Sequence, residues 1–231
     1  TIGDAAFSGC TALVNVNIPS LITSIATYTF SGCTALQTVN FPASLTAIGS
    51  NAFANCTGLT SLSFPAQLKT IAYAAFTGCS SLTSANLPSA LLSIDSKVFE
   101  SCTALSSVVI PASVKSIADY SFSNCISLTS VTIPSNVESL GEGIFYNCKG
   151  LNKIDMATGV KTIGNKAFQF CRGLTSIVIP SSVKTIGGYT FDSCDALRTV
   201  TLNENLESMD YYCFSGCSSM VNINLPNTLK T

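Results

Sequence analysis

The sequence of 231 residues contains no histidine and no tryptophan, and it is poor in charge. Without histidine, the chain cannot form a Ser-His-Asp triad, a Cys-His dyad or a His-ligated zinc site. Charged residues make up only 10% of the chain, with 11 basic and 12 acidic side chains. The resulting net charge of −1 offers no electrostatic footprint for nucleic acid or for an anionic membrane. We therefore expect no catalytic residues, no metal, no cofactor and no nucleic-acid partner.

Long hydrophobic runs are also missing. Apolar runs such as 108–110 have the length of a strand, whereas a membrane-spanning helix needs about 18 or more apolar residues. The first residues, 1–4, show neither the basic region nor the apolar region of a signal peptide. We expect neither a membrane span nor a signal peptide in this segment.

What the sequence does contain is one repeat of 23 residues. Phenylalanine recurs at this interval ten times, from Phe7 to Phe214. Cysteine follows three residues after each phenylalanine, from Cys10 to Cys217. Leucine stands three residues further on in nine copies, and Met220 replaces it in the tenth. Because ten copies fill the chain without an insertion, we expect a single solenoid domain over residues 1–231.

Each copy predicts a short strand that ends at a proline. In the copy that begins at Leu128, the residues Val131, Thr132 and Ile133 alternate between apolar and polar, as in a strand with one buried face. Pro134 then stops the strand, because proline cannot donate to a ladder. The apolar spacing over 137–145 favours a second short strand or turn, followed by one helical or 3₁₀ turn. One copy cannot bury its apolar face alone, so we expect the copies to stack.

The repeat pattern L-x-x-V-x-I-P-x-x-V-x-x-I-x-x-x-A-F-x-x-C is carried closely by Leu174–Pro180 and Val183–Phe191. It resembles the BspA-like, or Treponema pallidum-type, leucine-rich repeat, and the resemblance covers all 231 residues. The resemblance implies a leucine-rich-repeat solenoid of about ten turns, with a parallel β-sheet on its concave face and short strands, turns and helical turns elsewhere. It also implies a cell-surface or secreted protein that adheres to host proteins or to other cells. Ala157 and Asn203 depart from the pattern at the proline position.

Ten of the 11 cysteines occupy one position of the repeat, so they should form a column. Stacked strands lie about 4.8 Å apart, whereas the Cβ atoms of a relaxed disulfide lie about 3.8 Å apart. We therefore interpret the column as free, buried thiols that pack the core. Cys213 stands outside the column, and two alternatives remain open for it: a disulfide with Cys217, or a lone buried thiol.

The outward positions of the first strand offer the broadest repeated surface. In the first copies they are almost all Ser, Thr and Asn, which discriminate poorly between partners because every turn presents the same groups. In copies six to nine, charge and apolar groups join them, and such a mixture favours specificity. We predict the binding residues to be Ser130, Thr132, Lys153, Asp155, Ser176, Val178, Thr199 and Thr201.

Two alternatives compete with this assignment. Lys153 and Asp155 could pair only with each other, because side chains two residues apart on a strand project from the same face. A second surface could be built from the tyrosines that precede the phenylalanine column by two residues, although these could also simply cover their neighbours. They are Tyr28, Tyr120, Tyr189 and Tyr212.

The function expected from these observations is a non-enzymatic binding or adhesion module at a cell surface or in a secreted protein. Its ligand would be a protein or a glycan, with host extracellular proteins among the candidates. The alternative is an intracellular protein-protein interaction scaffold of the same fold, which free thiols would permit. The chain begins and ends in mid-repeat without polar caps, so we expect a fragment of a longer array whose uncapped termini could associate end to end.

Overall fold

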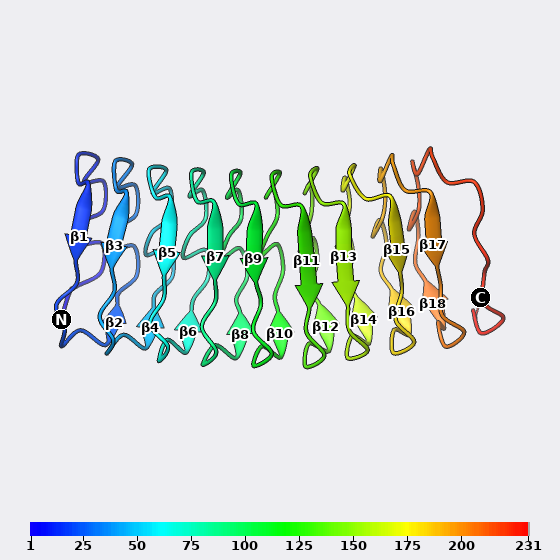
Figure 1. Cartoon of the computed structure of the whole chain (residues 1–231), viewed down its shortest axis with the longest axis horizontal. Helices are drawn as coiled ribbons and strands as arrows, with labels where there is room; N and C mark the ends of the chain where they lie inside the picture. Colours follow the sequence, from blue (N-terminus) through cyan, green and yellow to red (C-terminus); the bar gives the residue numbers. More distant parts are fainter. Residues whose placement is uncertain (231) are drawn as a thin grey trace.

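The computed structural model describes residues 1–230 and shows an elongated rod, in which the chain winds through one turn per sequence repeat (Figure 1). The two termini lie at opposite ends of the rod. The solenoid expected from the repeat is confirmed, although strands pair in nine copies rather than ten, because residues 220–230 form no strand. The predicted domain ends at Thr231, which lies outside the described residues.

A first set of parallel strands runs along one side of the rod, each strand following the leucine of its copy (Figure 1). Its members are β1 (Asn15–Asn17), β3 (Thr38–Asn40), β5 (Ser61–Ser63), β7 (Ser84–Asn86), β9 (Ser107–Val109), β11 (Ser130–Ile133), β13 (Lys153–Met156), β15 (Ser176–Val178) and β17 (Thr199–Thr201). Paired residues are 23 positions apart, as in Val16 opposite Val39. The second residue of each strand points inward, whereas the first and third mostly point to solvent.

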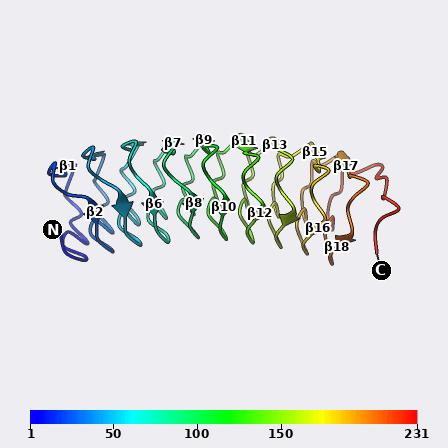
Figure 2. The ribbon, with the colours of Figure 1, turned by 90° about the horizontal axis from the view of Figure 1, so that it is seen from below.

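A second set of shorter parallel strands lies on another side of the rod (Figure 2). Its members are β2 (Ser24–Ile25), β4 (Ala47–Ile48), β6 (Thr70–Ile71), β8 (Ser93–Ile94), β10 (Ser116–Ile117), β12 (Ser139–Leu140), β14 (Thr162–Ile163), β16 (Thr185–Ile186) and β18 (Ser208–Met209). The second residue of each strand points into the core and the first is mostly exposed. The two sets therefore enclose one continuous core.

The phenylalanine column forms the centre of that core. Successive rings from Phe7 to Phe214 stack with centroids 5.2–5.7 Å apart and interplanar angles of 4–14°. The rings from Phe30 to Phe191 are fully buried, whereas Phe7 is 41% exposed because it has a neighbouring turn on one side only. Each copy thus buries its aromatic ring against the next copy, which explains why a single copy could not fold alone.

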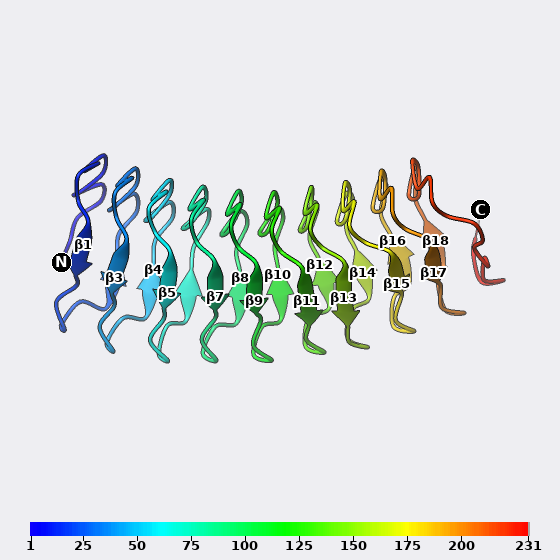
Figure 3. The same ribbon diagram turned by 45° about the horizontal axis from the view of Figure 1, so that its top comes forward.

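The segment that carries the phenylalanine is not helical, although the spacing favoured a helical turn. The described part of the chain contains no helix, and so none that could cross a membrane. The N–H groups of Tyr120, Phe122 and Asn124 instead donate to carbonyl oxygens of the next copy, at 2.8, 3.0 and 2.7 Å. A helix would need these N–H groups for its own bonds. The segments therefore form a third backbone ladder between turns, along one long edge of the rod (Figure 3).

Two residues in every copy adopt a left-handed backbone, which gives the segment its compact shape. Both Tyr120 and Asn124 do so, with φ values of 56° and 60°. Across the ten copies, the later of the two positions is occupied mostly by Gly, Asn and Ser, which tolerate this conformation. Phe170 is the bulky exception, with φ of 62°.

The cysteine column is confirmed as free thiols, eight of which are buried. From Cys33 to Cys217, every thiol of the column donates to the carbonyl oxygen of the phenylalanine one copy earlier, at 3.1–3.2 Å. Burial raises the pKa of the Cys102 thiol to about 12. Cys10 is an exception because it lies in the first copy and is exposed. Cys213 is a free, buried thiol, so the structure supports the second alternative for it.

Both departures from the proline position have a structural reason. Ala157 donates its N–H to the carbonyl of Ile133 at 3.1 Å, a bond that proline could not make, and it continues the four-residue pairing of β11 with β13. Asn203 bonds through its side chain instead: Nδ2 donates to the carbonyls of Pro180 and Val183, at 2.7 and 3.1 Å. The side-chain amide thereby fixes a turn that proline fixes in most copies.

Candidate functional site

The strand face, meaning the outward side chains of β1 to β17 in the first set, carries all eight predicted binding residues. They sit in pairs on neighbouring strands, with Ser130 opposite Lys153 and Thr132 opposite Asp155. The same register joins the pairs that follow on β15 and β17. All eight are exposed. The structure therefore brings the predicted residues together on one continuous surface.

Lys153 and Asp155 form an ion pair, with Nζ and Oδ2 2.8 Å apart. Their side chains are 66% and 53% exposed, so water screens the attraction strongly. The pairing that the sequence left open is thus present, and it presents a cation and an anion side by side to solvent. Val178, on β15, is 63% exposed and adds an apolar group beside them.

The first copies differ in how their outward side chains are satisfied. The Thr38 hydroxyl donates to Oδ1 of Asn15 at 2.5 Å, and Nδ2 of Asn40 donates to Oδ1 of Asn17 at 2.5 Å. These side chains therefore use part of their hydrogen-bonding capacity within the strand face. The strand face of copies six to nine therefore differs from that of the first copies in charge and in polar pairing.

The turn edge, meaning residues 3–11 and their repeats, holds a feature that the sequence only partly indicated. All seven tyrosines of the chain lie on it, at the repeat positions equivalent to residues 4, 5 and 8. The rings of Tyr189 and Tyr212 stack with centroids 5.1 Å apart, and Tyr211 meets Tyr189 edge-on at 5.2 Å. Tyr211 and Tyr212 are 54% and 63% exposed. The sequence pattern identified one tyrosine column and missed Tyr73, Tyr146 and Tyr211, which lie at other positions of the repeat.

Glu142 is the polar centre of the same edge. It accepts a hydrogen bond from the Tyr120 hydroxyl at 2.5 Å and one from Nζ of Lys166 at 3.0 Å. These two bonds lower the pKa of the Glu142 carboxyl. The Tyr120 ring lies across Gly143, where a Cβ atom would come within 2.3 Å of it. These contacts join three successive copies and fix the conformation of this part of the turn edge.

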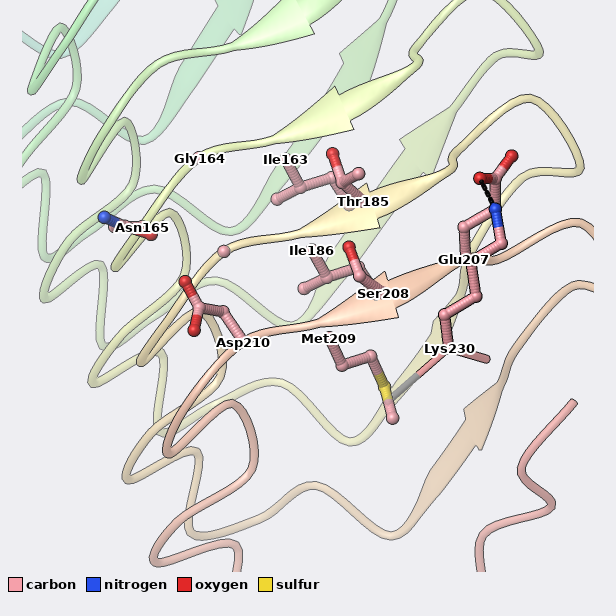
Figure 4. Close-up of a pocket in the computed structure, with 11 residues that line it drawn as sticks. Ile163, Gly164, Asn165, Thr185, Ile186, Glu207, Ser208, Met209, Asp210 and Lys230 are labelled. Carbon is pink, nitrogen blue, oxygen red and sulfur yellow. Dashed lines mark hydrogen bonds and ion pairs between the residues drawn. The ribbon is translucent and has the colours of Figure 1, made fainter. Parts of the chain in front are cut away.

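A shallow hollow of about 740 Å³ crosses the outer side of β14, β16 and β18 (Figure 4). Thr185 and Ser208 provide hydroxyls, and Glu207 and Lys230 stand at one side while Asn165 and Asp210 stand at the other. The hollow is open, and its lining combines these polar groups with the apolar side chains of Ile163, Ile186 and Met209.

Comparisons with known proteins give a family match over the whole chain. The model for the BspA type leucine rich repeat region matches residues 1–129 and 115–231. No curated protein matches the chain.

Solved structures agree on the fold. The leucine-rich repeat protein of Treponema pallidum is 28% identical, with a TM-score of 0.66 over 70% of this chain and 78% of that one. A leucine-rich repeat protein from Eubacterium ventriosum is 21% identical, with a TM-score of 0.63 over 99% and 77%. A leucine rich cell surface protein from Faecalibacterium prausnitzii is 22% identical, with a TM-score of 0.51 over 95% and 81%.

Proposed function

Because the chain belongs to the BspA type leucine-rich repeat family, we propose that it is a non-enzymatic binding module at a cell surface or in a secreted protein. Its strand face recognises a protein or a glycan, and host extracellular proteins are among the candidates. The observation that carries the proposal is the exposed patch on β11 to β17, where hydroxyl, charged and apolar side chains stand side by side.

The patch lies in copies six to nine because the charged side chains of the strand face, Lys153 and Asp155, occur there together with the exposed Val178, whereas copy five adds only Val109. A partner that aligns with Lys153 and Asp155 must present an anion and a cation in the matching order. A partner shifted by one turn meets hydroxyls or Val178 instead. The mixed patch can therefore select a register, which a uniform row of hydroxyls cannot do.

The surface location has two kinds of support. One structural relative is described as a cell surface protein, and it shares the repeat fold along 95% of this chain. The buried thiols of the cysteine column are compatible with an oxidising compartment, because each donates to a phenylalanine carbonyl and burial keeps it protonated at neutral pH. Free cysteines therefore do not argue against secretion.

A charge swap tests the proposal. The double variant Lys153→Asp with Asp155→Lys keeps the net charge and the ion pair but reverses their order. Against an array of immobilised extracellular-matrix proteins and glycans, we expect it to weaken the binding of the parent's ligand by about tenfold or more. Ser61→Arg, at the equivalent position of Lys153 on β5, should leave that binding unchanged.

Two outcomes contradict the proposal. If the swap binds normally while Ser61→Arg abolishes binding, the site lies in the uncharged copies. If the parent chain binds nothing on the array, the assignment as a binding module fails. Thermal unfolding of each variant shows that the fold is intact before binding is compared.

A further inference from the structure

Five of the 11 basic residues occupy a single position of the repeat, immediately before the second set of strands. This lysine line runs along the loop edge, meaning residues 19–23 and their repeats. The loop edge and the turn edge border the strand face on opposite sides. Its members are Lys69, Lys115, Lys161, Lys184 and Lys230. The same position carries two glutamates, Glu138 and Glu207, so the line has a surplus of three positive charges in a chain of net charge −1.

The glutamates hold some of the lysines in place without neutralising the line. Lys161 pairs with Glu138 at 2.8 Å, and Lys184 and Lys230 share Glu207 at 3.0 and 2.6 Å. Hydrogen bonds from Lys230 and Lys184 hold the pKa of Glu207 at about 2. The three lysine side chains remain 60–72% exposed. Their ammonium groups are thus both positioned and accessible.

Hollows open beside the same line. One of about 540 Å³ lies between Lys115 and Lys161 and is lined by Ser135, Asn136 and Thr158. A second, of about 450 Å³, lies beside Lys184 and Lys230 and is lined mainly by hydroxyl and amide side chains, namely Ser181, Ser182, Asn205 and Thr228. The hollow in Figure 4 also ends at Glu207 and Lys230. Cations, hollows and hydrogen-bonding groups therefore coincide on one edge.

The chemistry of this edge selects among anionic partners. No aromatic side chain lines the two hollows, so the edge lacks the stacking platforms that single-stranded nucleic acid uses. The two hollows also lack the aromatic or aliphatic anchors of a protein interface, and the exposed aliphatic side chains of the edge, Leu21 and Leu92, lie outside them. Hydroxyl, amide and ammonium groups instead suit the hydroxyls and anionic substituents of a polysaccharide.

The spacing along the line indicates a densely charged chain. Lys69, Lys115 and Lys161 follow each other at two turns, which is about 10 Å and comparable with the length of a disaccharide. Lys161 and Lys184 lie on adjacent turns, about 5 Å apart along the axis. A polysaccharide with one carboxylate per disaccharide could not place an anion at both Lys161 and Lys184, whereas a sulfated polysaccharide carries several anions per disaccharide.

We propose that the loop edge binds a sulfated polysaccharide laid along the rod, with its anions on the lysine line and its hydroxyls in the hollows. This inference goes beyond the proposed function, because it uses a surface separate from the strand face. It can fail while the strand-face proposal holds, and the reverse is equally true.

The test measures binding of heparin, as a sulfated probe, to the full chain at about 0.15 M salt, where weak surface attractions are screened. The triple variant Lys115→Gln, Lys161→Gln, Lys184→Gln should raise the Kd by about tenfold or more. The matched control replaces Lys97, Lys149 and Lys166 on the turn edge with Gln, removes the same charge and should change the Kd less than about twofold.

The glutamates provide a test of opposite sign. Glu138→Gln with Glu207→Gln removes the internal competitors for the lysines, so heparin should bind more tightly. Hyaluronan, which carries carboxylates only, and single-stranded poly(dT) should both bind more weakly than heparin. Three results would show only non-specific charge attraction and overturn the proposal. They are an equal rise in Kd in the two triple-lysine variants, an unchanged Kd in the glutamate variant, and an affinity for poly(dT) equal to that for heparin. An absence of heparin binding by the parent chain overturns it as well.

Discussion

From Cys33 onward, each cysteine of the column donates its thiol to a carbonyl oxygen that also accepts a backbone N–H, and so it connects two turns. The Phe99 carbonyl oxygen accepts the N–H of Cys102 in its own copy and the S–H of Cys125 in the next, both at 3.2 Å. The thiol thus fills the second lone pair of a buried carbonyl and packs as a small apolar group. Nine of the ten column cysteines, from Cys33 to Cys217, have this double role.

Replacing one such thiol should have a modest and measurable cost. We expect Cys125→Ala to lower the free energy of unfolding by about 1–2 kcal/mol, from the lost sulfur contacts and the lost hydrogen bond. The cost stays bounded because the Phe99 carbonyl keeps its bond from Cys102. Urea denaturation measures the difference.

Cys10→Ala serves as the matched control, because Cys10 is exposed and has no preceding turn to contact. It should change the free energy of unfolding by less than about 0.5 kcal/mol. Equal effects at the two positions would show that the thiol-to-carbonyl bond contributes nothing.

The sequence alone predicted which cysteines form the column, because each of them occupies the same position of the repeat. The exposure of Ser130, Thr132 and their neighbours followed from alternation along a strand. The partner of each thiol could not be predicted, because the bond joins residues 26 positions apart and depends on how stacked turns are offset. The pairing of Lys153 with Asp155 likewise depends on side-chain conformations, which the spacing leaves open.

At the scale of the element, the turn segment shows where local spacing misleads. The apolar residues around Phe145 fit one helical turn as well as they fit a series of tight turns. What decides between them is the neighbouring copy, whose carbonyls accept the N–H groups that a helix would use internally. The left-handed conformation of Tyr120 and Lys166 could not be predicted from the sequence, because neither residue type is typical of that backbone.

The loop that ends β17 tests whether a side chain can replace proline. Asn203 donates twice through Nδ2 and accepts the N–H of Asn205 at 2.8 Å through Oδ1. Asn203→Ala removes all three bonds and should lower the free energy of unfolding by about 1–2 kcal/mol. Asn203→Pro should keep most of the stability, because proline occupies this position in eight copies.

Thermal and urea denaturation of both variants measure these effects. Asn152→Ala is the control, because no hydrogen bond of the Asn152 side chain occurs among residues 1–230, and its stability should match that of the parent. If Asn203→Ala is as stable as the control, the side-chain amide does not fix the loop.

At the scale of the whole molecule, the thiols make the fold sensitive to alkali. Burial raises the pKa of Cys56 and Cys148 to about 12, as it does for Cys102, while a thiol in the unfolded chain titrates near 8.5. Above pH 8.5 the unfolded state therefore holds fewer protons than the native state, and stability falls as pH rises. Each buried thiol contributes a slope of about 1.4 kcal/mol per pH unit between these limits.

We expect the free energy of unfolding, measured in urea with a reductant present, to be flat from pH 6 to 8 and to fall steeply above about 8.5. Nine thiols are buried, so their combined effect should bring the free energy of unfolding to zero near pH 10. A variant with Cys56, Cys102 and Cys148 replaced by Ala should be less stable at pH 7 but should show a slope shallower by about a third. An unchanged slope would assign the alkaline loss to other groups.

The strict register of the ladders has an evolutionary consequence. Every strand pair joins residues 23 positions apart, so the removal or duplication of any 23-residue window reconnects the same partners. Each loop keeps its length, and each core position still contacts the equivalent positions of the copies on either side. Recombination between copies within the gene can therefore lengthen or shorten the rod in single steps, and each step among the neutral copies leaves the ion pairs between the charged copies intact.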